Sequence, residues 1–158
     1  MKLYSEMHGA EAEALEIDYE CGWDRERGLE QVLTDNRGLD GRYGATQNGP
    51  HRADLSFKIG RSKAVEILSR GQQKILVSAM KIAQGLLLSE ALDRSCLFLV
   101  DDLPSELDKV NREAVLAQLI GLGGQVFITC VEIDAVLNCL PEALEVATFH
   151  VERGTITA

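Results

Sequence analysis

Residues Cys96 to Asp102 read CLFLVDD, a short apolar run that ends in two adjacent carboxylates. Such a run is typical of a central strand that is covered on both faces. The two acids would then stand at the carboxyl end of a strand in an open sheet, where such folds bind their ligands. Neighbouring residues on a strand point to opposite sides, so Asp101 and Asp102 need not do the same work. A pair of solvated acids at a strand end would give the same pattern.

Strands and helices alternate around this run, in the second half of the chain. Apolar residues recur at three and four from Ser69 onward and predict a long helix. The alternation predicts an α/β fold with a mainly parallel sheet flanked by helices, built from crossover units. The later elements are expected as a helix from Leu107 to Ile120, a strand from Gln125 to Cys130, a helix from Glu132 to Leu140 and a strand from Val146 to Val151.

The first sixty residues have a different pattern. Apolar and polar residues alternate from Leu15 to Cys21 and from Ala53 to Ile59, which predicts two strands with one face in water. The second strand is expected to end in a turn at Gly60. Between the strands we expect a short helix from Arg25 to Asn36 and then a loop from Gly38 to Pro50, where four glycines and a proline disfavour regular structure.

Length and charge limit the class of protein. A chain of 158 residues is long enough for one core and too short for two ordinary domains, so we expect residues 1–158 to form a single domain. The net charge of −9 and the pI near 4.8 argue against a broad, sequence-independent nucleic-acid surface on this chain alone. The only basic zone is residues 61–94, with six Lys and Arg against three Asp and Glu.

Neither a signal nor a membrane span is expected. Met1 to Ala10 lacks the apolar core of a secretory signal, and the apolar stretch from Ile75 to Leu88 is interrupted by Lys81. We therefore expect a cytoplasmic protein with no membrane partner. The cysteines show no close paired spacing, which favours buried free thiols over metal ligands; they are Cys21, Cys96, Cys130 and Cys139.

A phosphate-binding pattern opens the long helix, where residues 68–73 read LSRGQQ. A helix amino terminus presents unpaired N–H groups and a positive dipole end. Ser69 adds a hydroxyl, and Gly71 lets the backbone approach an anion without a Cβ in the way. A serine that only caps the helix would give the same pattern.

A third motif, SELD at residues 105–108, follows the paired acids after two residues. Acids at a helix start are also favoured by the helix dipole. The order and spacing of the three motifs nevertheless resemble the signature, Walker B and D-loop of ABC-type ATPases. The forms GPHRADL at 49–55, LSRGQ at 68–72 and VDDLPSELD at 100–108 resemble the RecF family in particular, and the resemblance extends from Tyr19 to the end of the chain.

This resemblance implies a DNA-repair ATPase head that dimerises on ATP. It implies that Asp101 holds Mg²⁺ through water and that Asp102 orients or deprotonates the attacking water. It also implies binding to DNA at gaps, in recombination, replication and the SOS response, and action with RecO and RecR to help load RecA. In the dimer, the signature contacts the γ-phosphate held by the other subunit, and the D-loop flanks the site; the residues are Ser69, Arg70, Gly71 and Gln72 for the signature and Ser105 and Asp108 for the D-loop.

The sequence departs from the ATPase pattern in three ways. No Gly-Lys pair occurs anywhere, so the Walker A loop is absent, and we expect a carboxy-terminal fragment that does not hydrolyse ATP unaided. ATP and Mg²⁺ would both need the missing half. Cys130 follows Thr129 where ABC enzymes have His, and Asp102 replaces the usual, longer Glu, so we expect slow turnover.

Three alternatives stay open on the sequence. The chain could be a nucleotide-independent interaction module, because Walker A is absent. It could also be the head of an SMC-like or transporter ATPase. His51 and Arg52 could bind a ligand or DNA, although a structural role at the start of the second strand is favoured.

Overall fold

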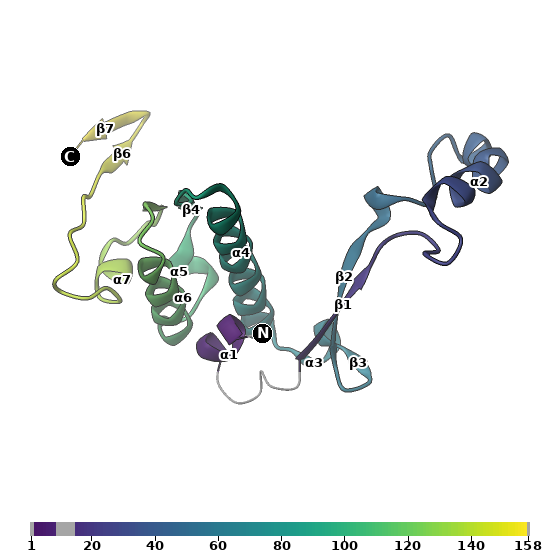
Figure 1. Cartoon of the computed structure of the whole chain (residues 1–158). Helices are drawn as coiled ribbons and strands as arrows, with labels where there is room; N and C mark the ends of the chain where they lie inside the picture. The colour runs from purple at the N-terminus through teal and green to yellow at the C-terminus, as the bar shows by residue number, and fades with distance from the viewer. Residues whose placement is uncertain (1, 9–14, 158) are drawn as a thin grey trace. The chain divides into compact units, whose positions relative to one another are not determined.

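The computed structural model describes residues 2–8 and 15–157, which divide into two compact units (Figure 1). Unit 1 covers Met1–Gln73 and unit 2 covers Lys74–Ala158. The earlier elements are α1 (Lys2–His8), β1 (Leu15–Glu20), α2 (Leu29–Tyr43), the 3-10 helix η2 (Pro50–Arg52), β2 (Asp54–Ile59), β3 (Ser62–Lys63), α3 (Ala64–Ile67) and α4 (Arg70–Leu92), which continues into unit 2. The later elements are β4 (Phe98–Val100), α5 (Leu103–Glu106), α6 (Lys109–Gly121), β5 (Val126–Ile128), α7 (Asp134–Leu137), β6 (His150–Glu152) and β7 (Thr155–Thr157).

Unit 1 contains a three-stranded antiparallel sheet in the order β1-β2-β3. Both strands predicted in this part of the chain are confirmed, and they pair along their whole length from Leu15 opposite Ile59 to Glu20 opposite Asp54. Directly opposite residues share a face. One face is therefore entirely apolar on β1 and β2, and much of it lies exposed at Ile17, Tyr19 and Leu55.

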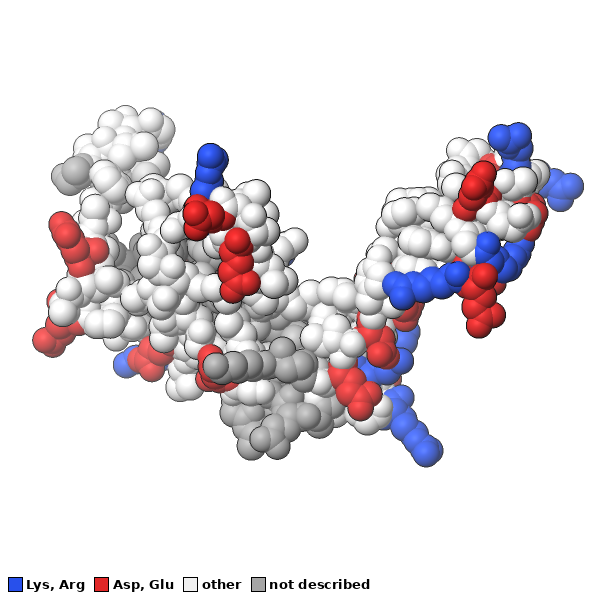
Figure 2. Space-filling model, viewed as in Figure 1, with Lys and Arg blue, Asp and Glu red and all other residues white. Residues whose placement is uncertain are grey.

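The other face of this sheet is charged. The Nζ atom of Lys58 on β2 lies 2.9 Å from the Oδ2 atom of Asp18 on β1. The hydrogen bond to Asp18 raises the pKa of Lys58 above its usual value. Figure 2 shows Lys and Arg side chains interleaved with Asp and Glu over this part of the molecule, on the face drawn.

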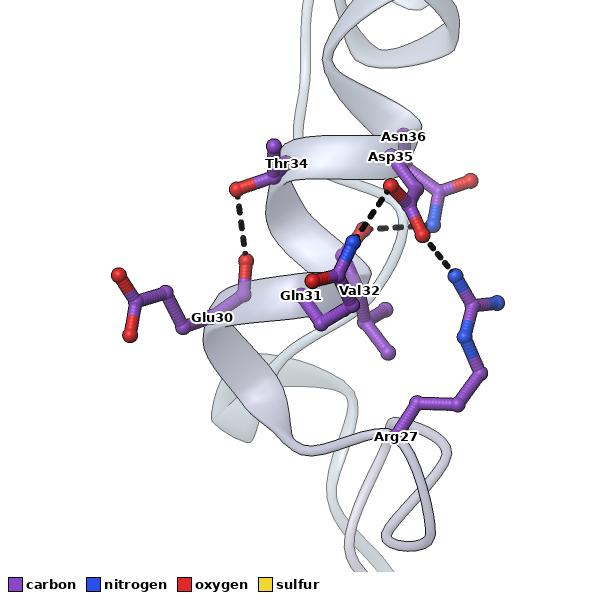
Figure 3. Close-up of polar contacts among 7 residues, drawn as sticks. All are labelled: Arg27, Glu30, Gln31, Val32, Thr34, Asp35 and Asn36. Atoms are coloured by element: carbon purple, nitrogen blue, oxygen red, sulfur yellow. Dashed lines mark hydrogen bonds and ion pairs between the residues drawn. The ribbon is translucent and has the colours of Figure 1, made fainter.

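Helix α2 is longer than predicted, and the predicted loop from Gly38 is wrong for its first six residues. Each helical glycine costs only about 1 kcal/mol relative to alanine. Side-chain bonds support the first turns instead, because Asp35 accepts hydrogen bonds from Arg27 and Gln31 (Figure 3). The helix ends where Gly44 takes the left-handed conformation that favours glycine.

The two chain segments that leave the β1–β2 ladder are held together at Gly22. The N–H of Gly49 donates to the carbonyl of Gly22 at 3.0 Å, and a Cβ on Gly22 would lie 2.4 Å from the carbonyl oxygen of Gly49. His51 hydrogen-bonds through Nε2 to the carbonyl of Thr46 at 2.8 Å, and the N–H of Arg52 donates to Gly49. These contacts favour the structural role for the GPHR segment at residues 49–52. We call Gly22 and this segment together the Gly22 clamp.

Unit 2 is built around the parallel pair β4–β5, in which Val100 lies opposite Ile128. Helix α4 packs closely on β4, because a Cβ on Gly85 would lie 2.5 Å from the ring of Phe98. The apolar spacing from Ser69 onward predicted this helix correctly. The buried side chains of α4 and α6 form most of the unit's core and are Ile75, Leu76, Ala79, Ile82, Val115, Leu116 and Leu119.

Parallel pairing among the described strands is confined to β4 and β5, and the other two sheets are antiparallel. The strand predicted from Val146 to Val151 is wrong at its start, since β6 begins at His150 and pairs only with β7. A strand needs a partner to satisfy its backbone hydrogen-bonding groups. The three residues of β7 pair only with His150–Glu152, so the ladder does not extend to Val146. The helix predicted from Leu107 begins at Lys109, after the separate turn of α5.

By length and composition alone, α4 could cross a membrane, although the core helix of a soluble protein passes the same test. All four cysteines are free, and only Cys21 is buried; the other three are half-buried, so the prediction of burial was wrong for them. Within the opening stretch Met1 to Ala10, Lys2–His8 form α1, and the remaining residues lie outside the described ranges.

Candidate functional site

The carboxyl ends of β4 and β5 bring the two predicted Walker B acids, Asp101 and Asp102, together with Thr129. The Thr129 hydroxyl donates to the Oδ1 atom of Asp101 at 2.5 Å and accepts the backbone N–H of Asp102 at 2.9 Å. The N–H of Thr129 donates to the carbonyl of Val100 at 3.0 Å and so continues the parallel ladder. One hydroxyl therefore joins both acidic residues to the neighbouring strand.

The chain turns sharply at Asp102, which adopts a left-handed backbone conformation with φ 46° and ψ 43°. A residue with a Cβ is disfavoured there by about 1–2 kcal/mol, although Asp tolerates it better than most. The carbonyl of Asp102 accepts the N–H of Ser105 at 3.1 Å, which starts α5. The two acids thus belong to different local structures, the strand end for Asp101 and the turn for Asp102.

The predicted D-loop residues lie between two short helical segments. Asp108 caps α6, because its carboxylate accepts the N–H of Asn111 at 3.0 Å and the side-chain amide of Asn111 at 2.8 Å. Ser105 is exposed on α5. Glu106, in the same segment, forms an ion pair of 2.6 Å with Lys74 near the start of α4. Sequence reasoning missed this ion pair, which connects the predicted D-loop to the long helix.

The predicted signature segment forms a capping box at the start of α4. The Ser69 hydroxyl accepts the N–H of Gln72 at 3.3 Å, while the Gln72 side chain accepts the N–H of Ser69 at 2.7 Å. Gln73 fixes the turn before the helix by donating to the carbonyls of Val65 and Leu68. The structure therefore confirms the interpretation that Ser69 caps the helix.

Capping does not exclude a role with phosphate. The Ser69 oxygen acts as an acceptor in the cap, so its proton can still be donated outward. The N–H groups of Arg70 and Gly71 precede the first backbone bond of the helix, which runs from Gln73 to the carbonyl of Ser69. Ser69 and Arg70 are exposed. The predicted signature lies in unit 1, and the two acids lie in unit 2.

The acids suit part of a magnesium site. Mg²⁺ is commonly held in proteins by one or two carboxylates through water. Asp101 is exposed, and its hydrogen bond to Thr129 uses Oδ1, which leaves Oδ2 able to accept from a metal-bound water. Among residues 2–8 and 15–157, no group of three or more His, Cys, Asp or Glu could hold a metal ion. The residues present fit Mg²⁺ as a partial site.

Thr129 is the site residue that sequence reasoning failed to assign. In the sequence, Thr129 stood out only as the residue before Cys130. A signal was present, however, because the carboxyl ends of neighbouring parallel strands meet at one edge of a sheet. The residue after β5 therefore had to lie beside the residue after β4.

Comparison with known proteins identifies what the chain resembles. No family model matches it. It is 51% identical over 142 residues to the DNA replication and repair protein RecF of Chromohalobacter salexigens. The RecF proteins of Stutzerimonas stutzeri and Azotobacter vinelandii are each 49% identical to it, over 145 and 147 residues. These alignments cover 90–93% of the chain.

The chain is homologous to part of RecF. It spans about two fifths of the length of these relatives, from 39% to 40%. The resemblance to RecF that the motifs indicated is confirmed, and the limited coverage agrees with a portion of a longer protein.

Two solved structures have the same fold as this RecF-like chain. They are described as the recombination mediator protein RecF-ATP and RecF-ATPrS in the RecFOR pathway. Each superimposes with a TM-score of 0.61, at 25% and 24% sequence identity respectively, over 99% and 98% of this chain and 43% of the solved chain. The α/β fold class predicted from the alternation of strands and helices, as a lobe of an ABC-type ATPase head, is confirmed.

Proposed function

We propose that this chain forms the signature, Walker B and D-loop part of a RecF-like DNA replication and repair ATPase. It completes an ATP site together with a Walker A segment from the rest of the protein, and two heads associate when ATP is bound. The names of the relatives support the DNA replication and repair role, and the name of one solved RecF structure supports ATP as the ligand.

The arrangement of Asp101, Asp102 and Thr129 carries this proposal. It places two acids of different backbone geometry at the carboxyl edge of a parallel strand pair. That edge is where open α/β sheets bind their ligands. A strand that ended in acids for solubility alone would not need a threonine hydroxyl bonded to both residues.

Each residue has a distinct task in the proposed site. Asp101 holds Mg²⁺ through water, and the ion neutralises charge on the phosphates. Asp102 orients or deprotonates the attacking water. The signature Ser69, Arg70, Gly71 and Gln72 contacts the γ-phosphate held by the other subunit. In the proposed D-loop, Ser105 offers an exposed hydroxyl and Asp108 caps the start of α6.

The partners follow from the same proposal. The protein acts in the cytoplasm, binds DNA at junctions of single and double strands, and works with RecO and RecR to help load RecA. Turnover is slow, because Cys130 replaces a histidine donor and Asp102 is one methylene shorter than glutamate. A rate typical of transporter ATPases in the reassembled protein would contradict slow turnover.

A calorimetric titration of Mg-ATP tests the split site. The chain is titrated alone and then mixed with a separately produced Walker A half from a RecF relative. We expect binding only in the mixture. Tight binding to the chain alone would point to a different phosphate site and would overturn the proposal.

Two variants of the full-length protein test the assigned residues. Ser69→Arg places a large cation where the signature meets phosphate, and Asp101→Asn removes the charge that holds Mg²⁺. We expect both to abolish ATP-driven dimerisation in light scattering while circular dichroism stays unchanged. Normal dimerisation in both variants, or ATP-independent binding to RecR with no response to ATP, would favour an interaction module instead. A transmembrane partner or a coiled-coil arm on the full-length protein would favour a transporter or SMC-like head.

A further inference from the structure

Thr129 makes contacts that its own strand does not require. It lies one residue beyond β5, and its backbone N–H already continues the ladder to Val100. Its hydroxyl is used entirely for the acidic segment, as a donor to Asp101 Oδ1 and as an acceptor from the Asp102 N–H. Both Thr129 and Asp101 are exposed, so no buried polar group makes this arrangement necessary.

We propose that Thr129 is the positioning residue of the metal site, orienting the Asp101 carboxylate and the turn at Asp102. This inference rests on the proposed function. A hydroxyl that donates to one carboxylate oxygen restricts rotation of that carboxylate and directs its other oxygen. Asp101 acts on the metal through water, and the removal of hydrogen-bonding groups outside a metal's own ligands commonly changes metal affinity by about 10–100-fold.

The backbone contact adds a second effect on the same two acids. Asp102 holds a left-handed conformation that most residues avoid. The bond from its N–H to the Thr129 hydroxyl fixes this turn to β5. One oxygen atom therefore sets both the direction of the Asp101 side chain and the start of the Asp102 turn, so the spacing of the two acids depends on β5.

The residue type suits this task. A β-branched side chain has a restricted χ1 angle, so a threonine hydroxyl is aimed more rigidly than a serine hydroxyl. Thr129→Val keeps the shape and the branching but removes the hydroxyl, whereas Thr129→Ser keeps the hydroxyl and loses the methyl group. The pair separates a requirement for the hydrogen bonds from a requirement for packing.

The test measures binding of Mn²⁺ in place of Mg²⁺. Full-length protein that carries this sequence is titrated with Mn²⁺ in the presence of ATP, and free Mn²⁺ is followed by electron paramagnetic resonance. We expect Thr129→Val to raise the apparent dissociation constant of Mn²⁺ by about 10-fold or more. Thr129→Ser should stay within about 3-fold of the unchanged protein, because it restores the hydroxyl.

A matched control comes from α2. Thr34 also uses its hydroxyl for one local bond, to the carbonyl of Glu30 at 2.9 Å, and it has no place in the proposed site. Thr34→Val should leave Mn²⁺ binding unchanged. Thermal unfolding of every variant is measured in parallel, so that a loss of metal affinity can be distinguished from a loss of folding stability.

The outcomes separate this inference from the proposed function. If Asp101→Asn abolishes Mn²⁺ binding and Thr129→Val leaves it unchanged, the positioning role is overturned and the proposed function stands. Equal weakening by Thr129→Val and Thr129→Ser, with matching losses of melting temperature, would also overturn it in favour of packing. If Asp101→Asn itself has no effect on Mn²⁺ binding, the proposed metal site fails, and the role of Thr129 fails with it.

Discussion

Each of the two units is stabilised internally in a different way. In unit 2, α4 and α6 bury one face each, and Ile75 and Leu116 are 0% and 1% exposed. In unit 1, the sheet leaves Tyr19 57% exposed on its apolar face, and its ends are joined by backbone contacts at the Gly22 clamp. Side-chain packing therefore dominates the stability of unit 2, and backbone fit has a larger share in unit 1.

The largest expected effect comes from the core of unit 2. Leu116→Ala would leave a cavity in α6 and lower the free energy of unfolding by about 3 kcal/mol. Urea denaturation followed by circular dichroism measures the change. Leu99→Ala is the matched control, because Leu99 is 77% exposed on β4, and its replacement should cost less than about 0.5 kcal/mol. Equal losses in the two variants would contradict the packing account.

The next largest effect tests backbone fit in unit 1. Gly22→Ala forces a side chain onto φ 86° and places its Cβ against the Gly49 carbonyl, which should cost about 2–3 kcal/mol. Gly44→Ala has a left-handed backbone with a similar φ of 69°, but its Cβ would meet no atom within 4 Å, so about 1 kcal/mol is expected. Trp23, the only tryptophan, adjoins Gly22 and reports unfolding by fluorescence. Similar losses for the two glycines would show that the clamp adds nothing.

A smaller effect of opposite sign is expected in α2. Gly38 and Gly41 lie inside the helix, and a Cβ on either would meet no atom within 4 Å. Gly41→Ala should therefore stabilise unit 1 by about 0.4–1 kcal/mol, since alanine loses less backbone freedom on folding. Thermal unfolding measures the gain. A loss of stability would contradict the absence of atoms within 4 Å of a Cβ at Gly41.

The smallest effect concerns the pair of Lys58 and Asp18. The pKa of Lys58 is raised above its usual value of 10.5 in the folded chain. The stability that the pair contributes is therefore fully present below the unfolded pKa of Lys58 and is lost as the pH rises through its folded pKa. Both side chains are exposed, so the melting temperature should change by no more than about 2 °C. Melting curves of the unchanged chain and of Lys58→Met, between pH 9 and 12, should converge at high pH. Parallel curves over that range would rule out the pair as the cause.

The sequence predicted elements that depend on local periodicity. The alternation from Leu15 and the spacing after Ser69 located β1 and α4, because period two and period 3.6 directly reflect how side chains are placed along a strand and along a helix. The boundaries of α2 were missed, since side chains from Arg27 to Asp35 support a helix that its glycines disfavour. Strand pairing was predicted least well, because β7 and β6 become strands only by pairing with each other.

The candidate site divides in the same way. The signature forms within one helical turn, so its capping box could be recognised from Ser69 and Gln72 alone. The other half of the site depends on Thr129, which lies 28 positions beyond Asp101 and reaches it only when β5 pairs with β4. Motif spacing predicted the acids as site residues but could not show that Thr129 hydrogen-bonds to both of them.

The Gly22 clamp also affects how freely this region can change in length. The β1–β2 ladder pairs Glu20 with Asp54, so α2 is an insertion within a hairpin whose ends are closed at Gly22 and Gly49. Closing a chain segment twice as long costs only about 0.6 kcal/mol more. Adding or removing helical turns between these glycines should therefore change the free energy of unfolding little, whereas a side chain at Gly22 would collide with the Gly49 carbonyl.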